Sequence, residues 1–179
     1  LFNMIAGAFA PDGGAISFAG ERIDGLPPDH ICRRGIGRTF QIVRPFPSLS
    51  VEDNVIVGAL LHRRHVLDAR AHAHTVLRRL DLFDKRAQRA SALTLPDRKR
   101  LEVARALATD PKLLLLDEVM AGLRPTETDR MVQILLDLSA NPNMRAGERR
   151  ELRRTHGEAF DRLTQALLQQ ALGDVAAEE

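Results

Sequence analysis

The sequence predicts an α/β fold in which a short buried strand lies between two helices. The strand is predicted from the apolar run Leu113–Leu116, which is too short for a helix core and suits a parallel strand covered on both faces. Helical spacing precedes this run, with apolar residues sharing one face at Leu101, Ala104, Leu107 and Ala108. A second helical stripe follows it, at Met131, Ile134, Leu135 and Leu138.

Composition places the chain among globular proteins with one sizeable core. Its 179 residues are 44% hydrophobic and 28% charged. The 26 Lys and Arg nearly balance the 24 Asp and Glu, so no overall field favours nucleic acid. Cys32 is the single cysteine, which excludes an internal disulfide and fits a reducing cytosol. The longest apolar stretch, Val55–Leu61, is far shorter than the roughly 20 residues that span a bilayer, so we expect membrane association only through a partner.

The first forty residues are predicted to form short elements separated by turns. Leu1–Gly7 has the pattern of a helix end with Gly7 as a left-handed stop, so we expect the chain to be a piece of a longer protein, cut within a helix. A turn signal and a short apolar segment predict an antiparallel hairpin near residues 11–20. Asp29 is predicted to cap a short helical turn, and residues 35–41 to be a second extended piece.

A mainly helical subdomain is predicted from about residue 50 to 95. Ser50–Asp53 is a helix-start pattern, and apolar residues follow at Leu67, Val76, Leu77 and Leu80. Pro96 is predicted to start the next helix, which Asp110-Pro111 ends. Beyond Asn141-Pro142-Asn143 an arginine-rich stretch carries an apolar stripe that includes Phe160 and Leu163, so residues 141–179 are expected to add one amphipathic helix.

Two adjacent carboxylates follow the predicted buried strand. An apolar strand that ends in Asp117 and Glu118 can deliver them to a nucleotide, where the first holds Mg²⁺ and the second orients and deprotonates water. The same pattern also occurs where a carboxylate merely caps a helix. The pattern by itself leaves both interpretations open.

The surrounding residues resemble the ATP-binding subunits of ABC transporters. Arg98–Asp117 is similar to the helix and Walker B strand of that family, and Asp117–Glu127 to Walker B running into the D-loop. Arg38–Gln41 resembles the Q-loop. The similarity covers about residues 1–140 and is greatest to the LivG type, from branched-chain amino-acid importers. It implies a partial P-loop NTPase domain at 1–140 with a helical subdomain at about 50–95, followed by a non-family helical tail at 141–179.

The resemblance also implies a set of site residues. Asp117 would bind Mg²⁺, Glu118 would be the catalytic base, and Gln41 would contact the metal and sense the transporter. Thr94, Asp97 and Gly122 would contact the ATP held by a second ATP-binding subunit. The implied cofactors are ATP and Mg²⁺. The implied partners are membrane permease subunits and not nucleic acid, with the chain on the cytoplasmic face of the membrane.

Three departures from the family pattern predict that the 179-residue chain is inactive alone. Within these residues there is no glycine-rich loop ending in Lys-Ser/Thr, which is the cradle for phosphates. The family's signature, Leu-Ser-Gly-Gly-Gln, is replaced by Leu93–Asp97, which reads Leu-Thr-Leu-Pro-Asp and has lost both glycines. The switch histidine is also missing, because His156 is best interpreted as a surface or packing residue.

Other functions remain as alternatives at this point. The chain could be a non-catalytic remnant that acts as an interaction module, or a DNA-repair or chromosome ATPase with the same motifs. The short spacing between Gln41 and the signature region favours a transporter. A metal site could also be built from the histidines, although a solvated helix face explains them better. These histidines are His62, His65, His72 and His74.

Overall fold

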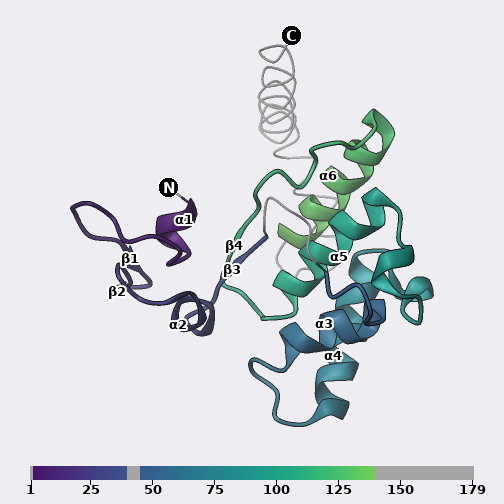
Figure 1. The fold of residues 1–179 in the computed structure, drawn as a ribbon, viewed down its shortest axis with the longest axis horizontal. Helices are drawn as coiled ribbons and strands as arrows, with labels where there is room; N and C mark the ends of the chain where they lie inside the picture. The colour runs from purple at the N-terminus through teal and green to yellow at the C-terminus, as the bar shows by residue number, and fades with distance from the viewer. Residues whose placement is uncertain (1, 40–44, 140–179) are drawn as a thin grey trace, which may run out of the picture. The chain divides into compact units, whose positions relative to one another are not determined.

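The computed structural model describes residues 2–39 and 45–139 (Figure 1). The chain divides into two compact units, Leu1–Ile134 and Leu135–Glu179. Apart from the end of one helix, the second unit lies outside the described residues. The same holds for the predicted tail helix at 141–179, for His156 and for Gln41. The boundary near residue 140 stays a prediction.

The N-terminal segment contains the predicted helix end and hairpin. Helix α1 (Phe2–Ile5) is followed by Gly7, whose φ of 74° and tight surroundings explain the glycine, because a Cβ there would lie 2.4 Å from the Leu26 carbonyl oxygen. Strands β1 (Ser17–Phe18) and β2 (Glu21–Arg22) pair antiparallel, which confirms the hairpin.

Helix α2 (Pro28–Arg33) corrects the prediction for Asp29. The capping position is Pro27, and no side chain caps this helix. Asp29 is already the second helical residue, because Pro28 has no N–H and its fixed φ suits the first position. The carboxylate of Asp29 therefore lies inside the first turn, where it can interact favourably with the helix dipole but cannot cap the helix.

Two strands confirm the parallel pairing that the apolar run predicts. Strand β3 (Ile36–Arg38) pairs with β4 (Leu113–Leu115), with Arg38 opposite Leu115. The prediction that the run is covered on both faces was wrong at its start, where Leu113 is 37% exposed while Leu115 is buried. Among the described residues β4 has a strand partner on one side alone, and its burial increases toward its carboxyl end.

Two helices, α3 (Val51–Ala59) and α4 (Val66–Arg79), lie within the predicted helical region, and α5 (Leu95–Leu107) follows it. Helix α3 is capped as expected, since the Ser50 hydroxyl accepts a hydrogen bond from the Asp53 N–H at 3.0 Å. It packs on both α4 and α5. The crossing is close at Gly58, where a Cβ would lie 2.5 Å from the Arg105 carbonyl oxygen. Two 3₁₀ turns, η1 (Phe83–Lys85) and η2 (Ala90–Ala92), connect α4 to α5.

The core of these helices follows the expected stripes with one exception. Val76, Leu77 and Leu80 are buried, whereas Leu67 is 75% exposed in the first turn of α4. Helix α6 (Pro125–Ser139) buries Met131 and Ile134 from its predicted stripe. No described helix has the length and apolar character needed to cross a membrane.

Candidate nucleotide site

The two predicted carboxylates, Asp117 and Glu118, lie just beyond the carboxyl end of β4. Thr39 directly follows β3 and is fully buried. Its N–H donates to the Leu115 carbonyl at 3.0 Å, and its hydroxyl accepts from the Asp117 N–H at 2.9 Å. Asp117 and Glu118 form the carboxylate turn. This pair of bonds fixes the backbone of the turn against the end of the neighbouring strand β3.

Arg38 is a residue of this site to which the sequence analysis gave no role. Its Nη2 donates to Asp117 Oδ2 at 3.1 Å, and its Nη1 donates to the Asn3 side-chain oxygen at 2.6 Å. The Arg38 Nε is buried and, within the described part of the chain, has no hydrogen-bond partner. The ion pair joins residues 79 positions apart. They come together because β3 pairs with β4 in this register, which cannot be inferred from the sequence.

Glu118 adopts a backbone conformation that is uncommon for a residue with a side chain. Its φ is 49°, in the left-handed region. The Glu118 carbonyl accepts hydrogen bonds from the Lys99 ammonium at 2.9 Å and from the Ala121 N–H at 3.1 Å. The side chain is exposed, and the next residue, Val119, is buried. The turn is thus anchored through its backbone and leaves the carboxylate at the surface.

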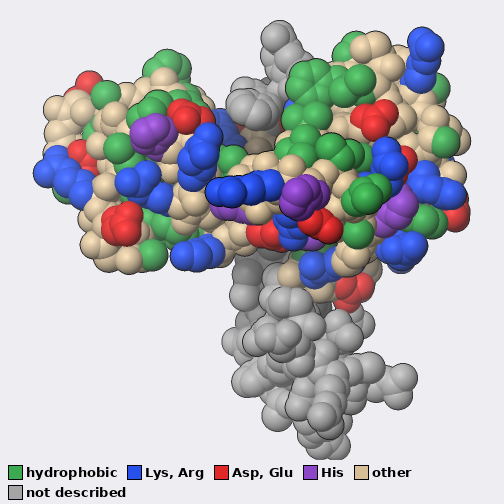
Figure 2. Space-filling model, turned by 90° about the horizontal axis from the view of Figure 1, so that it is seen from below, with side chains coloured by type: hydrophobic (Ala, Val, Ile, Leu, Met, Phe, Trp, Pro, Cys, Tyr) green, Lys and Arg blue, Asp and Glu red, His purple; other side chains and the backbone are tan. Residues whose placement is uncertain are grey.

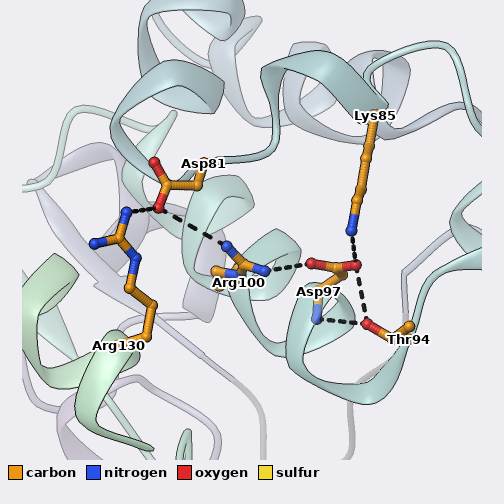
Figure 3. A network of polar contacts seen from close by, with 6 residues as sticks. All are labelled: Asp81, Lys85, Thr94, Asp97, Arg100 and Arg130. Carbon is orange, nitrogen blue, oxygen red and sulfur yellow. Dashed lines mark hydrogen bonds and ion pairs between the residues drawn. The ribbon is translucent and has the colours of Figure 1, made fainter. Parts of the chain in front are cut away.

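The segment that replaces the family signature, Leu93–Asp97, begins helix α5 and is closed by its own side chains. Thr94 caps the helix, and its hydroxyl donates to Asp97 Oδ2 at 2.9 Å (Figure 3). The Asp97 carboxylate is also bonded by Lys85 from η1 and by Arg100 from the next turn of α5. Asp97 is only 2% exposed. A nucleotide contact by this carboxylate would require these bonds to break.

The surroundings of Asp97 act on its pKa in opposite directions. Burial alone would raise the pKa, but the hydrogen bonds from Lys85 and Thr94 and the charge of Arg100 outweigh it, so the pKa is lowered. The carboxylate therefore stays ionised inside the protein. It serves as the common partner of two cations and a helix cap.

Further ion pairs extend this network to α6. Arg100 lies 4.0 Å from Asp81, and Asp81 is also bonded by Arg130, as Figure 3 shows. Asp81, with a φ of 55°, follows the C-terminal cap of α4, and Arg130 belongs to α6. The charges of the signature segment are thus linked to two other helices.

Gly122 and the signature segment lie against each other. Gly122 has a φ of 76°, and a Cβ at that position would lie 3.3 Å from the Leu95 Cδ2 atom. The structure therefore brings two of the predicted regions together within the same chain. Thr94 and Gly122 are exposed, whereas Asp97 is not.

The four histidines considered for a metal site are engaged with carboxylates or exposed in the described structure. His74 bonds Glu52 at 2.7 Å, and His72 Nε2 lies 3.2 Å from Asp110 Oδ1, outside hydrogen-bond geometry. Burial lowers the pKa of His72 more than the Asp110 charge raises it. In residues 2–39 and 45–139 no group of three or more His, Cys, Asp or Glu could hold a metal ion. On the face in Figure 2, basic and acidic side chains lie among one another.

The fold and the motifs are those of an ABC-type ATP-binding protein, and a comparison with protein families agrees. Residues 1–121 match the family described as ABC transporter, so the chain belongs to the ABC transporter family. Among curated relatives it is similar to the high-affinity branched-chain amino acid transport ATP-binding protein LivG of Escherichia coli K12, with 35% identity over 158 residues. It is also similar to BraF of Pseudomonas aeruginosa, with 34% identity. Each alignment covers 80% of this chain and 62% of the relative.

Solved structures support the same fold. MJ1267, an ATP-binding cassette of an ABC transporter, matches with a TM-score of 0.67 and 27% identity over 76% of this chain and 59% of that one. CbiO1 from Clostridium perfringens, part of the ABC transporter complex CbiONQ, matches with a TM-score of 0.67 and 28% identity, over 76% and 55% of the two chains. The chain thus spans less than two thirds of the relatives it resembles.

Proposed function

We propose that this chain forms the carboxylate-bearing part of an ATP-hydrolysing subunit of an ABC transporter. The observation that carries the proposal is the parallel register of β3 and β4. It brings Thr39, which lies within the predicted Q-loop segment, into hydrogen-bond contact with the Asp117 backbone. Two sequence motifs 78 positions apart thereby form one edge of a site. In open α/β sheets, ligands bind at the carboxyl ends of the strands.

The residues present fit the metal better than they fit the phosphates. Asp117 offers a half-buried carboxylate at the carboxyl edge of β4, and carboxylate oxygens are preferred ligands of Mg²⁺. Arg38 lies on its Oδ2 atom and would have to share or release this carboxylate. The 179 residues contain no glycine-rich loop ending in Lys-Ser/Thr, so the phosphates would need groups beyond those of this chain.

The two carboxylates have different tasks in this proposal. Asp117 would hold Mg²⁺, directly or through water, and Glu118 would orient the attacking water and take its proton. Bound Mg²⁺ would neutralise charge on the phosphates. The exposure of the Glu118 side chain and the bonded backbone beneath it suit a base that must reach a water molecule without moving the strand. Gln41, outside the described residues, is proposed to contact the metal and to sense the transporter.

A second ATP-binding subunit would complete the site. Thr94 and Gly122, both exposed, are proposed to face the nucleotide held by that subunit. Asp97, the third predicted residue, is proposed to contribute by holding the start of α5, because its carboxylate is buried and bonded. Leu95 and Pro96 replace two glycines and Pro96 has no N–H, so this contact should be weaker than a glycine-rich backbone would give.

Branched-chain amino acids are the proposed transported substrates. The proposal is supported by the 35% identity to LivG, whose description is a branched-chain amino acid transport ATP-binding protein. Membrane permease subunits would be the partners, and they would hold the chain on the cytoplasmic face of the membrane. The substrate would be chosen by those subunits, because an ATPase site does not contact it.

The decisive experiment compares two forms of the chain. The 179-residue chain should neither release phosphate from ATP above background nor bind ATP tightly with Mg²⁺ present. An extended chain, carrying an added N-terminal strand and glycine-rich Lys-Ser/Thr loop and a family-type C-terminal ending with its switch histidine, should hydrolyse ATP, and Glu118→Gln in that form should abolish turnover. Turnover that survives Glu118→Gln would refute the role of Glu118. An extended chain that folds and binds ATP without turnover would instead support a non-catalytic module.

A further inference from the structure

Lys99, in helix α5, is a buried ammonium group that the proposed site does not yet use. The residue is only 5% exposed, and its Nζ donates to the Glu118 carbonyl oxygen at 2.9 Å. Burying a charged amine costs free energy unless it is well paired, and this partner is a neutral backbone carbonyl. An apolar side chain of similar length would fill the same space at lower cost. Packing alone therefore does not account for a lysine here.

The backbone of Glu118 needs support from its surroundings. A left-handed conformation, with φ of 49°, is unfavourable for a residue with a side chain and persists only where neighbouring contacts fix it. On one side the Asp117 N–H is bonded to Thr39, and on the other Val119 is buried. The Glu118 carbonyl between these anchors is held by Lys99 and by the Ala121 N–H. Lys99 supplies the charged hydrogen bond of this set.

We propose that Lys99 is a positioning residue that holds the Glu118 backbone in its left-handed conformation and so sets where the Glu118 carboxylate stands. The functional part of this inference rests on the proposed role of Glu118 as the base. Lys99 comes two positions after Asp97, whose carboxylate is bonded to Lys85 and Arg100. The start of α5 is thus fixed to η1 by Asp97 and to the carboxylate turn by Lys99.

This role differs from simple stabilisation in what it predicts for a replacement. Lys99→Met keeps the length and buries well but removes the donor, so the whole fold should be as stable as before or more stable. The carboxylate turn should nevertheless open more often, since the Glu118 carbonyl loses its charged donor. Lys99→Arg keeps a charged donor and is the matched control. A stabilising lysine would instead lose global and local protection together.

Hydrogen exchange followed by mass spectrometry on the 179-residue chain tests the proposal. In Lys99→Met, exchange of the Ala121 amide, in the peptide that spans residues 117–123, should be roughly tenfold faster, the factor expected for losing one charge-assisted hydrogen bond. The thermal midpoint should not fall, and Lys99→Arg should restore slow exchange. If Lys99→Met does not fold, as circular dichroism would show, Lys99→Gln replaces it with a side chain too short to reach the carbonyl.

Two results would overturn the proposal. Unchanged exchange in a folded Lys99→Met or Lys99→Gln chain would mean that Lys99 does not hold the turn. Faster exchange throughout the chain, with a lower midpoint, would mean that Lys99 only stabilises the fold. The hydrogen-exchange measurement needs no nucleotide. Its result can therefore be interpreted even if the proposed ATPase function proves wrong.

Discussion

The signature segment (Leu93–Asp97) and the carboxylate turn (Asp117–Glu118) are held in different ways, although Gly122, in the loop after the turn, lies against Leu95 of the signature segment. In the signature segment the polar side chains bond one another and neighbouring helices, so Asp97 is buried. In the carboxylate turn the backbone makes the anchoring bonds, while Asp117 is half-buried in an ion pair with Arg38 and Glu118 is exposed. The first segment thus holds its buried carboxylate in internal bonds, whereas in the second the backbone fixes the turn and its carboxylates lie at or near the surface.

The largest effect should come from opening the signature segment at Asp97. Asp97→Ala removes the partner of Lys85 and Arg100 and the hydrogen bond with Thr94, leaving cations partly buried without a counter-charge. We expect a loss of about 3 kcal/mol in the free energy of unfolding. Urea unfolding followed by circular dichroism would measure it, because the chain has no Trp or Tyr for fluorescence.

Two milder changes serve as controls for that result. Thr94→Ala removes the cap and the hydrogen bond from Thr94 to Asp97 but leaves the ion pairs with Lys85 and Arg100, and it should cost about 1 kcal/mol. Asp97→Asn keeps an oxygen for hydrogen bonding but loses the charge, so its cost should lie below that of Asp97→Ala. An Asp97→Ala chain as stable as the wild type would contradict the closed network of Figure 3.

On the other side of the comparison, Thr39→Val should loosen the carboxylate turn. The change keeps the buried shape but leaves the Asp117 N–H without its acceptor at 2.9 Å. We expect a loss of about 1.5 kcal/mol in unfolding free energy. Thr39→Ser, which keeps the hydroxyl, is the control measured beside it in urea. If Thr39→Val and Thr39→Ser were equally stable, the hydroxyl would not be what anchors the turn.

The contact between the signature segment and the loop that follows the carboxylate turn can be tested at Gly122. Gly122→Ala places a Cβ at a φ of 76° and 3.3 Å from Leu95, at a cost of about 1 kcal/mol. In the double variant with Leu95→Ala the crowding disappears and only the backbone cost should remain. A double-mutant cycle of unfolding free energies would show this coupling. Strictly additive effects would mean that the segments do not touch.

The smallest effect that we expect is a dependence of stability on pH in the acidic range. The pKa of Asp97 is lowered in the folded chain from its ordinary value of 3.8, so its contribution to stability is full above about pH 4 and is lost as the pH falls through the lower, folded value. Asp24, whose pKa is lowered to about 2 chiefly by its hydrogen bond from Arg22, also loses its charge in acid. The difference between wild type and Asp97→Asn isolates Asp97. That difference should shrink as the pH falls below 4, and a constant difference would exclude the linkage.

Features that depend on residues close in sequence were predictable. The Ser50 cap bonds a residue three positions away, and the apolar run before Asp117 correctly predicted a parallel strand. The start of α5 was also placed to within a residue, because Pro96 occupies its second position. Such features arise from local spacing and backbone preference, which the sequence displays.

The interactions that define the site were not predictable in the same way. Arg38 reaches Asp117 across 79 positions, and Lys99 reaches the Glu118 carbonyl only because α5 packs behind the turn. Lys85 meets Asp97 because η1 folds back on the start of α5. Each depends on strand register or helix packing. The sequence shows where the charged residues are along the chain, but it does not show which of them come into contact in the fold.

The central claim, that the carboxylate turn carries the chemistry with separate tasks for its two residues, is tested most directly by measuring ATP binding with and without Mg²⁺ in the extended chain. Glu118→Gln should bind ATP like the wild type while releasing no phosphate, because the base is lost but the metal ligand remains. Asp117→Asn should lose the Mg²⁺-dependent part of binding. Equal loss of binding in both variants would contradict the assignment of the metal to Asp117 and of the proton to Glu118.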